Sequence, residues 1–189
     1  MLKRGIQLIT LASCISFVSA CTPLLNSTPI TDNKGSRSLG TLYNDQLIET
    51  SAVDAILRAS PLLANANVGA VSVNGIVLLI GQVPSEDTKI IAGAKARGIS
   101  NARKVHNELL VSGPASYIVR TNDTLITTKV KARMVGETAF PVSRIKVITE
   151  NGVVYLMGLV THAEADWAVR IVSSASGIQR IVKVFEYID

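Results

Sequence analysis

The stretch VITENGVVYLMGLV (147–160) decides the fold, because the first half of the chain holds a close counterpart, VSVNGIVLLIGQV (71–83). In both, Asn-Gly separates two apolar runs rich in β-branched residues. This is the strongest short signal for a β-hairpin, since a type I′ turn needs positive φ at both central residues. Gly81 and Gly158 fall near the end of the second strand, where a bulge or a close backbone approach is expected.

The similarity between the two halves extends well beyond the hairpin. NDQLIETSAVDAIL (44–57) matches NDTLITTKVKARM (122–134), and GISNARKVHNELL (98–110) matches GIQRIVKVFEYI (177–188). The offset stays at 77 to 79 residues throughout. A period this long, present only twice, indicates two tandem small domains and not a solenoid.

Each repeat shows the same order of periodicities. Residues 46–59 carry apolar residues at helical spacing, and the hairpin follows. A second helix comes next, and in the second repeat it opens with a capping box from Thr161 to Glu164. Gly98 and Gly177 stand where a helix C-cap favours positive φ. A final strand completes an α+β fold of order α-β-β-α-β, in which two helices cover one face of a three-stranded mixed sheet.

The N-terminus has the features of an export signal. Lys3 and Arg4 precede an uncharged run from Ile6 to Val18, which is too short to span a bilayer and has the length of a signal-peptide core. Val18-Ser19-Ala20-Cys21 then resembles a lipobox, so residues 1–20 are predicted to be a lipoprotein signal peptide. Two alternatives remain open: a rival lipobox that ends at Cys14, and an ordinary secretory signal.

Cleavage before Cys21 would leave it as the sole cysteine, available for lipidation (with palmitate among the acyl chains) and not for a disulfide or a cysteine-based metal site. Thr22, not Asp, follows, which by analogy with lipoprotein sorting indicates the outer membrane. Residues 21–45 are rich in small and polar residues and are predicted to form a lipidated, flexible tether. The domains are expected over 46–111 and 122–189. The linker at 112–121 is short enough for the two domains to touch.

The composition and net charge disfavour some classes of function. The 189 residues are 48% apolar and 17% charged, which is typical of a globular protein. The net charge of +5 falls to +3 without residues 1–20, which contain two of the 19 basic and none of the 14 acidic residues. This small charge and the lack of an aromatic stacking pair disfavour a nucleic-acid partner. His106 and His162 have no second ligand at metal spacing and are interpreted as surface residues. No catalytic residue, metal or cofactor is expected.

The order of these motifs, with "V…NG.V.L.G.V" between two helices and a closing "V.N.L.V" strand, resembles the BON domain twice over. With the lipobox, the whole chain is similar to dual-BON lipoproteins of the outer membrane. The resemblance implies a non-enzymatic, periplasm-facing monomer that supports outer-membrane integrity. It also implies a second domain that contacts anionic phospholipid, and a link to the β-barrel assembly machinery and to cell division sites.

The first helix of the second repeat is the predicted lipid contact. At 100° per residue, Ile126, Val130 and Met134 share one face, which is expected to contact the core. Leu125 and Lys129 point elsewhere, and an exposed apolar tip beside cations is suited to interfacial binding. The predicted phospholipid site comprises Leu125, Thr128, Lys129, Ala132, Arg133 and Gly136.

Several alternatives accompany this site. Leu125 departs from the aromatic residue that a similar dual-BON lipoprotein is expected to carry there, and it could instead pack against the other domain or the linker. The equivalent helix of the first repeat carries Glu49 and Asp54, so only the second domain is expected to bind anionic lipid. Phe140 is interpreted either as a second membrane contact or as a plug over the sheet edge, and Trp167 as a residue at the edge of the core face. The alternative function is a protein-interaction adaptor for an outer-membrane assembly complex.

Overall fold

The computed structural model describes residues 35–189, so the signal peptide, Cys21 and the first part of the predicted tether lie outside the described residues. Within the described part, none of the helices is long and apolar enough to cross a bilayer.

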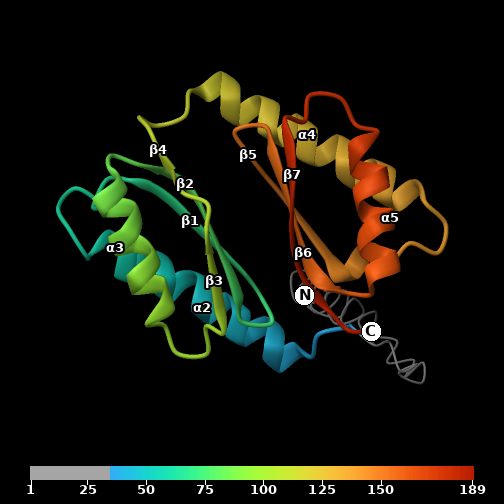
Figure 1. Ribbon diagram of the computed structural model, residues 1–189, viewed down its shortest axis with the longest axis horizontal. Helices are drawn as coiled ribbons and strands as arrows, with labels where there is room; N and C mark the ends of the chain where they lie inside the picture. The colour runs from blue at the N-terminus through green and yellow to red at the C-terminus, as the bar shows by residue number, and fades with distance from the viewer. Residues whose placement is uncertain (1–34) are drawn as a thin grey trace, which may run out of the picture. The chain divides into compact units, whose positions relative to one another are not determined.

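Both repeats adopt the predicted α-β-β-α-β order, and the α+β fold is confirmed (Figure 1). The first domain consists of α2 (Leu39–Leu57), β1 (Asn67–Val73), β2 (Ile76–Val83), α3 (Glu86–Arg97), β3 (Lys104–Asn107) and β4 (Leu110–Val111). The second consists of α4 (Tyr117–Gly136), a 3-10 turn η1 (Val142–Arg144), β5 (Ile145–Glu150), β6 (Val153–Val160), α5 (His162–Ser173) and β7 (Arg180–Tyr187).

Each sheet is mixed, and the second strand of the hairpin, β2 or β6, lies in the middle of its sheet. β1 is antiparallel to β2 and β5 to β6, whereas the closing strand runs parallel to the central one. In the first domain the closing strand is interrupted at Glu108 and Leu109, so β3 and β4 pair with β2 separately.

The hairpin turns have the predicted conformation. Asn74 and Gly75 have φ of 52° and 75°, and Asn151 and Gly152 have φ of 49° and 73°. Positive φ at both central residues is the requirement of a type I′ turn, so the prediction from Asn-Gly is confirmed.

Gly81 and Gly158 each lie against backbone at or just before the start of the neighbouring strand. A Cβ atom at Gly81 would collide with the carbonyl oxygen of Asn67, and one at Gly158 with that of Arg144. Gly81 also has a φ of +113°, which side-chain-bearing residues rarely adopt. The expected close approach is therefore present in both domains.

The loops that follow the second helices differ from the prediction. Gly98 is the C-cap of α3, but its φ is −82°, because the chain continues in tight turns with Gly98 N–H donating to Lys95. Asn101, with φ of 66°, takes the left-handed conformation in this loop. Gly177 has the expected positive φ of 91°, although the C-cap of α5 is Ser174.

Both first helices begin earlier than the sequence suggested. The Ser38 hydroxyl accepts a hydrogen bond from Thr41 N–H at 3.1 Å, and α2 begins at Leu39, inside the range expected to be tether. Ser116 caps α4 in the same way, so α4 begins at Tyr117, inside the expected linker. Serine is a favoured N-cap because its oxygen satisfies a free amide of the first turn.

Each domain has its own core between its helices and one face of its sheet. In the first domain, Ile48 and Ile56 of α2 pack with Leu79 of β2. In the second, Ile126, Val130 and Met134 of α4 are at most 1% exposed, so the predicted core face of this helix is confirmed.

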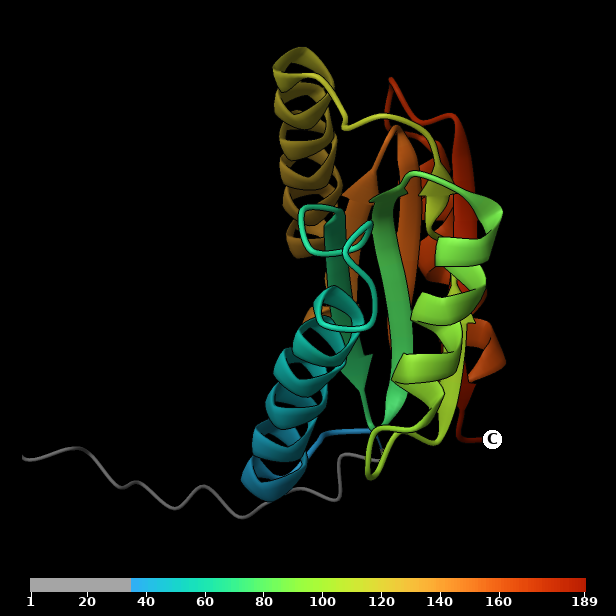
Figure 2. The same ribbon diagram turned by 90° about the vertical axis from the view of Figure 1, so that its left-hand side faces the viewer.

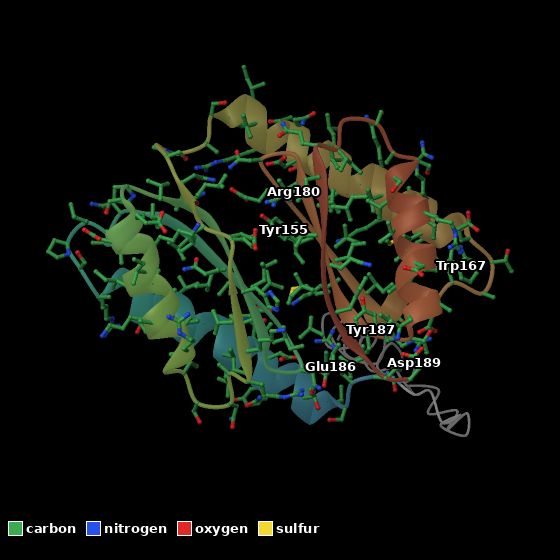
Figure 3. All side chains as sticks on the ribbon, in the orientation of Figure 1. Tyr155, Trp167, Arg180, Glu186, Tyr187 and Asp189 are labelled. Carbon is green, nitrogen blue, oxygen red and sulfur yellow. The ribbon has the colours of Figure 1, made fainter. Side chains whose placement is uncertain are left out.

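The opposite faces of the two sheets pack against each other. A third apolar cluster joins Val73, Ile76, Leu78 and Ile80 of the first domain to Tyr155, Met157 and Val184 of the second. Figure 3 places Tyr155 between the two sheets. The result is four layers, with helices outside and two sheets inside (Figure 1). In the view of Figure 2, α2 and α4 lie on one side of this body, whereas α3 and α5 lie on the other.

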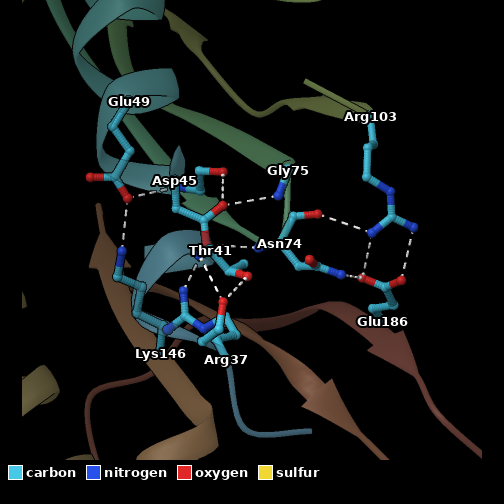
Figure 4. Close-up of polar contacts among 11 residues, drawn as sticks. Arg37, Thr41, Asp45, Glu49, Asn74, Gly75, Arg103, Lys146 and Glu186 are labelled. Atoms are coloured by element: carbon cyan, nitrogen blue, oxygen red, sulfur yellow. Dashed lines mark hydrogen bonds and ion pairs between the residues drawn. The ribbon is translucent and has the colours of Figure 1, made fainter. Parts of the chain in front are cut away.

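Polar contacts lie beside this apolar interface, and Figure 4 shows those near the Asn74-Gly75 turn. Arg103 pairs with Glu186 across the domain boundary, and Lys146 pairs with Glu49 at 2.8 Å. Elsewhere on the boundary, Gln82 donates to Glu150 at 2.6 Å. The expected contact between the domains is therefore present, and it is made through the sheets.

Candidate functional site

A buried carboxylate positions each first helix against its own hairpin. Asp123 of α4 accepts hydrogen bonds from the backbone N–H groups of Asn151 and Gly152, both at 2.8 Å. Asp45 occupies the equivalent place on α2 and accepts from Asn74 and Gly75, both at 2.9 Å. These bonds fix which side of each helix faces the sheet and which side faces outward.

Asp45 makes more contacts than its counterpart. It also accepts from the Ser72 hydroxyl at 2.7 Å and from the Arg37 guanidinium at 2.9 Å. Burial by itself raises the pKa of Asp45, but the hydrogen bonds to its carboxylate, first among them that from Gly75, outweigh this effect and hold the pKa below its ordinary value.

The structure brings the six predicted site residues together on the outer surface of α4. Leu125 is 54% exposed, so the expectation that it points away from the core is confirmed. The other five are exposed too: Thr128, Lys129, Ala132, Arg133 and Gly136. Arg133 is partly engaged, because it donates to the Ser174 hydroxyl at 2.8 Å.

Three exposed apolar residues of the same helix were missed. Tyr117, Ile118 and Val135 are 84%, 80% and 72% exposed. At 3.6 residues per turn they lie with Leu125 within roughly 100° of the helix circumference. Tyr117 and Ile118 were missed because their segment was assigned to the linker; the signal that could have revealed them is Ser116 as an N-cap.

Cations border this apolar row on both sides. Arg120 and Lys131 lie along one edge, and Lys129 and Arg133 along the other, as the helical periodicity requires. All four are exposed, whereas the sole acidic residue of α4, Asp123, is buried. The outer surface of α4 is therefore apolar in the middle and positive at its edges.

The threonines of α4 add little polarity to this surface. The hydroxyls of Thr121, Thr124 and Thr128 each donate to the carbonyl oxygen four residues earlier, at 2.9 to 3.0 Å. Such bonds satisfy the hydroxyl proton within the helix.

A hollow of about 380 Å³ lies beside the row, between α4 and β5. Arg120 and Lys131 line it together with two acidic residues, Asp123 and Glu150, and several threonines, among them Thr127, whose hydroxyl donates to Thr149 at 2.7 Å. Cationic and hydroxyl groups are the side chains that bind phosphate oxygens.

Phe140 and Trp167 belong to the core of the second domain. Phe140 is 6% exposed and meets Trp167 edge to face, with ring centroids 5.3 Å apart. The interpretation of Phe140 as a plug is therefore confirmed, and that of a membrane contact is wrong. Trp167 is half-buried against this core on the outer side of α5 (Figure 3).

The two histidines have different surroundings. His106 is half-buried on β3, and its pKa is lowered by burial and by nearby Lys104. His162 is exposed, stacks on Tyr187 and pairs through Nδ1 with Asp189 at 2.7 Å. Among the residues that the structure describes, no three metal-binding side chains of His, Cys, Asp or Glu come together.

Comparison with known proteins gives consistent results. The family model described as the BON domain matches residues 44–113 and 122–189. Outer membrane lipoprotein DolP of Haemophilus influenzae is 40% identical over 81% of this chain and 79% of its own length. A 21 kDa hemolysin of Actinobacillus pleuropneumoniae is 30% identical over 81% of this chain and 79% of its own. Osmotically-inducible protein Y of Escherichia coli is 27% identical over 76% and 72%.

Proposed function

Because this chain belongs to the BON-domain family, as an outer-membrane lipoprotein with two such domains, we propose that the outer surface of α4 binds anionic phospholipid and that the protein supports outer-membrane integrity. The role is one of binding and not of catalysis. The observation that carries it is the apolar row of Tyr117, Ile118, Leu125 and Val135 between two rows of cations.

The chemistry of this surface suits the lipid interface. Leucine and valine side chains favour the acyl region, and tyrosine favours the headgroup level. The cations at both edges meet lipid phosphates at about 1 kcal/mol each, and burial of Leu125 adds about 1.5–3 kcal/mol.

These contributions support weak, reversible binding, and the predicted lipid anchor at Cys21 reinforces it. An anchor turns the contact into an intramolecular event with a high effective concentration. The selectivity for anionic lipid belongs to the second domain, because α4 carries four Lys or Arg residues whereas α2 carries none. Glu49 pairs with Lys146, and Asp54 with Arg58.

Vesicle sedimentation tests the proposal. Mature protein with Cys21→Ser, which cannot be lipidated, is titrated with vesicles of zwitterionic lipid alone or with added phosphatidylglycerol. The variant Leu125→Glu with Lys129→Glu should bind the anionic vesicles about tenfold more weakly or worse, since it loses an apolar contact and reverses a charge.

The matched control is Ile90→Glu with Lys95→Glu on α3. Ile90 is 59% exposed and Lys95 is exposed, so this variant makes the same chemical change on the other side of the body (Figure 2). Equal loss of binding in both variants, or no loss in the α4 variant, would show that α4 is not the lipid site.

A protein-interaction adaptor is the second candidate, because an exposed helical row of apolar residues also fits the groove of a partner. The β-barrel assembly machinery is the partner that we propose for this case. The two functions separate in cells: if the α4 variant abolishes lipid binding but still restores resistance to detergent in a strain that lacks the protein, the adaptor function is favoured.

A further inference from the structure

We infer that the first three turns of α2 form a second lipid contact, uncharged and facing the same membrane as α4. This inference rests on the proposed function, since it takes α4 as the first contact. It assigns a lipid contact to α2, which has no Lys or Arg residue.

The first observation is an apolar patch at the start of α2. Leu39, Leu42, Tyr43 and Leu47 are 86%, 41%, 67% and 48% exposed. Leu39, Tyr43 and Leu47 follow one another at intervals of four residues and therefore lie along one side of the helix. One exposed leucine is ordinary, but four large apolar residues on adjacent turns form a patch that marks a binding surface.

The second observation is the absence of charge from this surface. Between residues 39 and 51, none of the exposed side chains is charged. The two acidic residues in this range are turned inward: Asp45 is buried on the Asn74-Gly75 turn, and Glu49 accepts from Ser72 N–H and pairs with Lys146. The patch has no cation for a lipid phosphate, so its contact with lipid does not depend on headgroup charge.

The choice of a lipid surface as the partner follows from where the chain leads. Leu39 is 18 residues after Cys21, the predicted lipidation site. Even a fully extended segment of that length reaches only about 60 Å, so the start of α2 stays near the anchoring membrane. Leucines with a tyrosine among them are typical of the boundary between acyl chains and headgroups.

The arrangement of the helices allows both contacts at once. In the view of Figure 2, α2 and α4 lie on the same side of the two-sheet body, and the packed sheets hold them there. The polar contact of Lys146 on β5 with Glu49 on α2 links the two domains on this side. We therefore assign the two helices to one membrane-facing side, with α2 as the neutral contact and α4 as the anionic-selective one.

Depth-resolved fluorescence tests the inference on the full, lipid-anchored protein. Three variants, Leu47→Cys on α2, Leu125→Cys on α4 and Ile90→Cys on α3, each receive a nitrobenzoxadiazole label and are reconstituted into vesicles that contain spin-labelled lipid. The engineered cysteine is the sole labelling site if Cys21 is lipidated. All three native residues are exposed, and urea unfolding verifies that each labelled protein remains folded.

The expected result distinguishes the two helices. The label at position 47 should be quenched at least about twofold more than the label at position 90, in neutral and in anionic vesicles alike, because apolar insertion needs no lipid charge. The label at position 125 should show strong quenching only when anionic lipid is present, because its neighbouring cations supply the attraction.

Failures of the two proposals look different. If position 125 is quenched and position 47 matches position 90, the α2 contact is overturned and the proposed function stands. If position 125 is never quenched, the proposed function fails, and quenching at position 47 would still support contact of α2 with lipid. If quenching at position 47 disappears when the protein is diluted tenfold at constant lipid, the patch binds a second copy of the chain, and the inference is overturned.

Discussion

Glu186 of the second domain is held from across the domain boundary by Arg103 of the first. The Nη1 and Nη2 atoms of Arg103 lie 3.0 and 2.8 Å from the two carboxylate oxygens of Glu186, a two-point pairing. Asn74 adds a hydrogen bond to the same carboxylate at 2.8 Å, so a residue of the first hairpin turn also takes part. The hydrogen bond from Arg103 is the main reason that the pKa of Glu186 lies below its ordinary value.

Removal of this pair should weaken the domain interface modestly. Because Arg103 is 54% exposed, solvent screens the pair, and Arg103→Ala should lower the free energy of unfolding by about 1 kcal/mol or less. The loss should shrink as pH falls through the lowered pKa of Glu186, since a protonated carboxyl no longer pairs. Urea unfolding at several pH values measures this. Arg58→Ala, which removes the exposed pair with Asp54, is the control and should have a smaller effect.

Asp45→Ala should destabilise the protein more severely. It leaves the N–H groups of Asn74 and Gly75 without their acceptor, at a cost of about 1–3 kcal/mol for each group left buried and unsatisfied. The depressed pKa of Asp45 gives the sign of its pH dependence: its contribution is full above the unfolded pKa of about 3.9 and is lost as pH falls below it. The free energy of unfolding of the variant should therefore fall less than that of the wild type as the pH is lowered, as measured by urea unfolding from neutral to acidic pH. An equal fall in the two proteins would contradict this role.

Gly81→Ala should be strongly destabilising, by about 2 kcal/mol or more, because it combines strained φ with a collision against the Asn67 carbonyl. The control is Gly113→Ala, where a Cβ would have no neighbour within 4 Å and the change should stay within about 0.5 kcal/mol. Thermal unfolding of the two variants provides the comparison. Equal melting temperatures would mean that the strand can shift to admit the methyl group.

Phe140→Ala should affect stability but leave lipid affinity unchanged. The ring is buried against Trp167, and loss of such a side chain costs about 3–5 kcal/mol. Vesicle sedimentation at a temperature where the variant is folded should give the wild-type affinity. A weaker affinity of the folded variant for vesicles would indicate that Phe140 contributes to lipid binding after all.

Much of the fold could be predicted from local patterns. Asn-Gly at 74–75 and 151–152 fixed the hairpins, because few other dipeptides tolerate positive φ twice in succession. The spacing of Ile126, Val130 and Met134 identified the buried face of α4, since a helix has one periodicity and one core to meet. The exposed position of Leu125 followed from the same geometry.

The remainder depended on less distinct signals. The starts of α2 and α4 rest on single serine caps within segments that read as polar linkers, so Tyr117, Ile118 and the patch on α2 were missed. The packing of sheet against sheet had a clue in IVLLIGQV, where strand β2 is buried at every position. An unbroken apolar run indicates burial on both faces of a strand but does not say what covers the second face.

Because each sheet covers the apolar outer face of the other, each repeat needs the other to bury that face. If the first repeat were expressed alone, Leu78 and Ile80 would be exposed to water on a sheet face; for the second repeat, the exposed residues would include Tyr155 and Met157. An exposed apolar sheet face promotes aggregation. Because the two sheets share one apolar cluster, loss of packing in one repeat should destabilise the other. Unfolding should therefore be a single cooperative event, and a mutation that disrupts the core of the first domain should also destabilise the second.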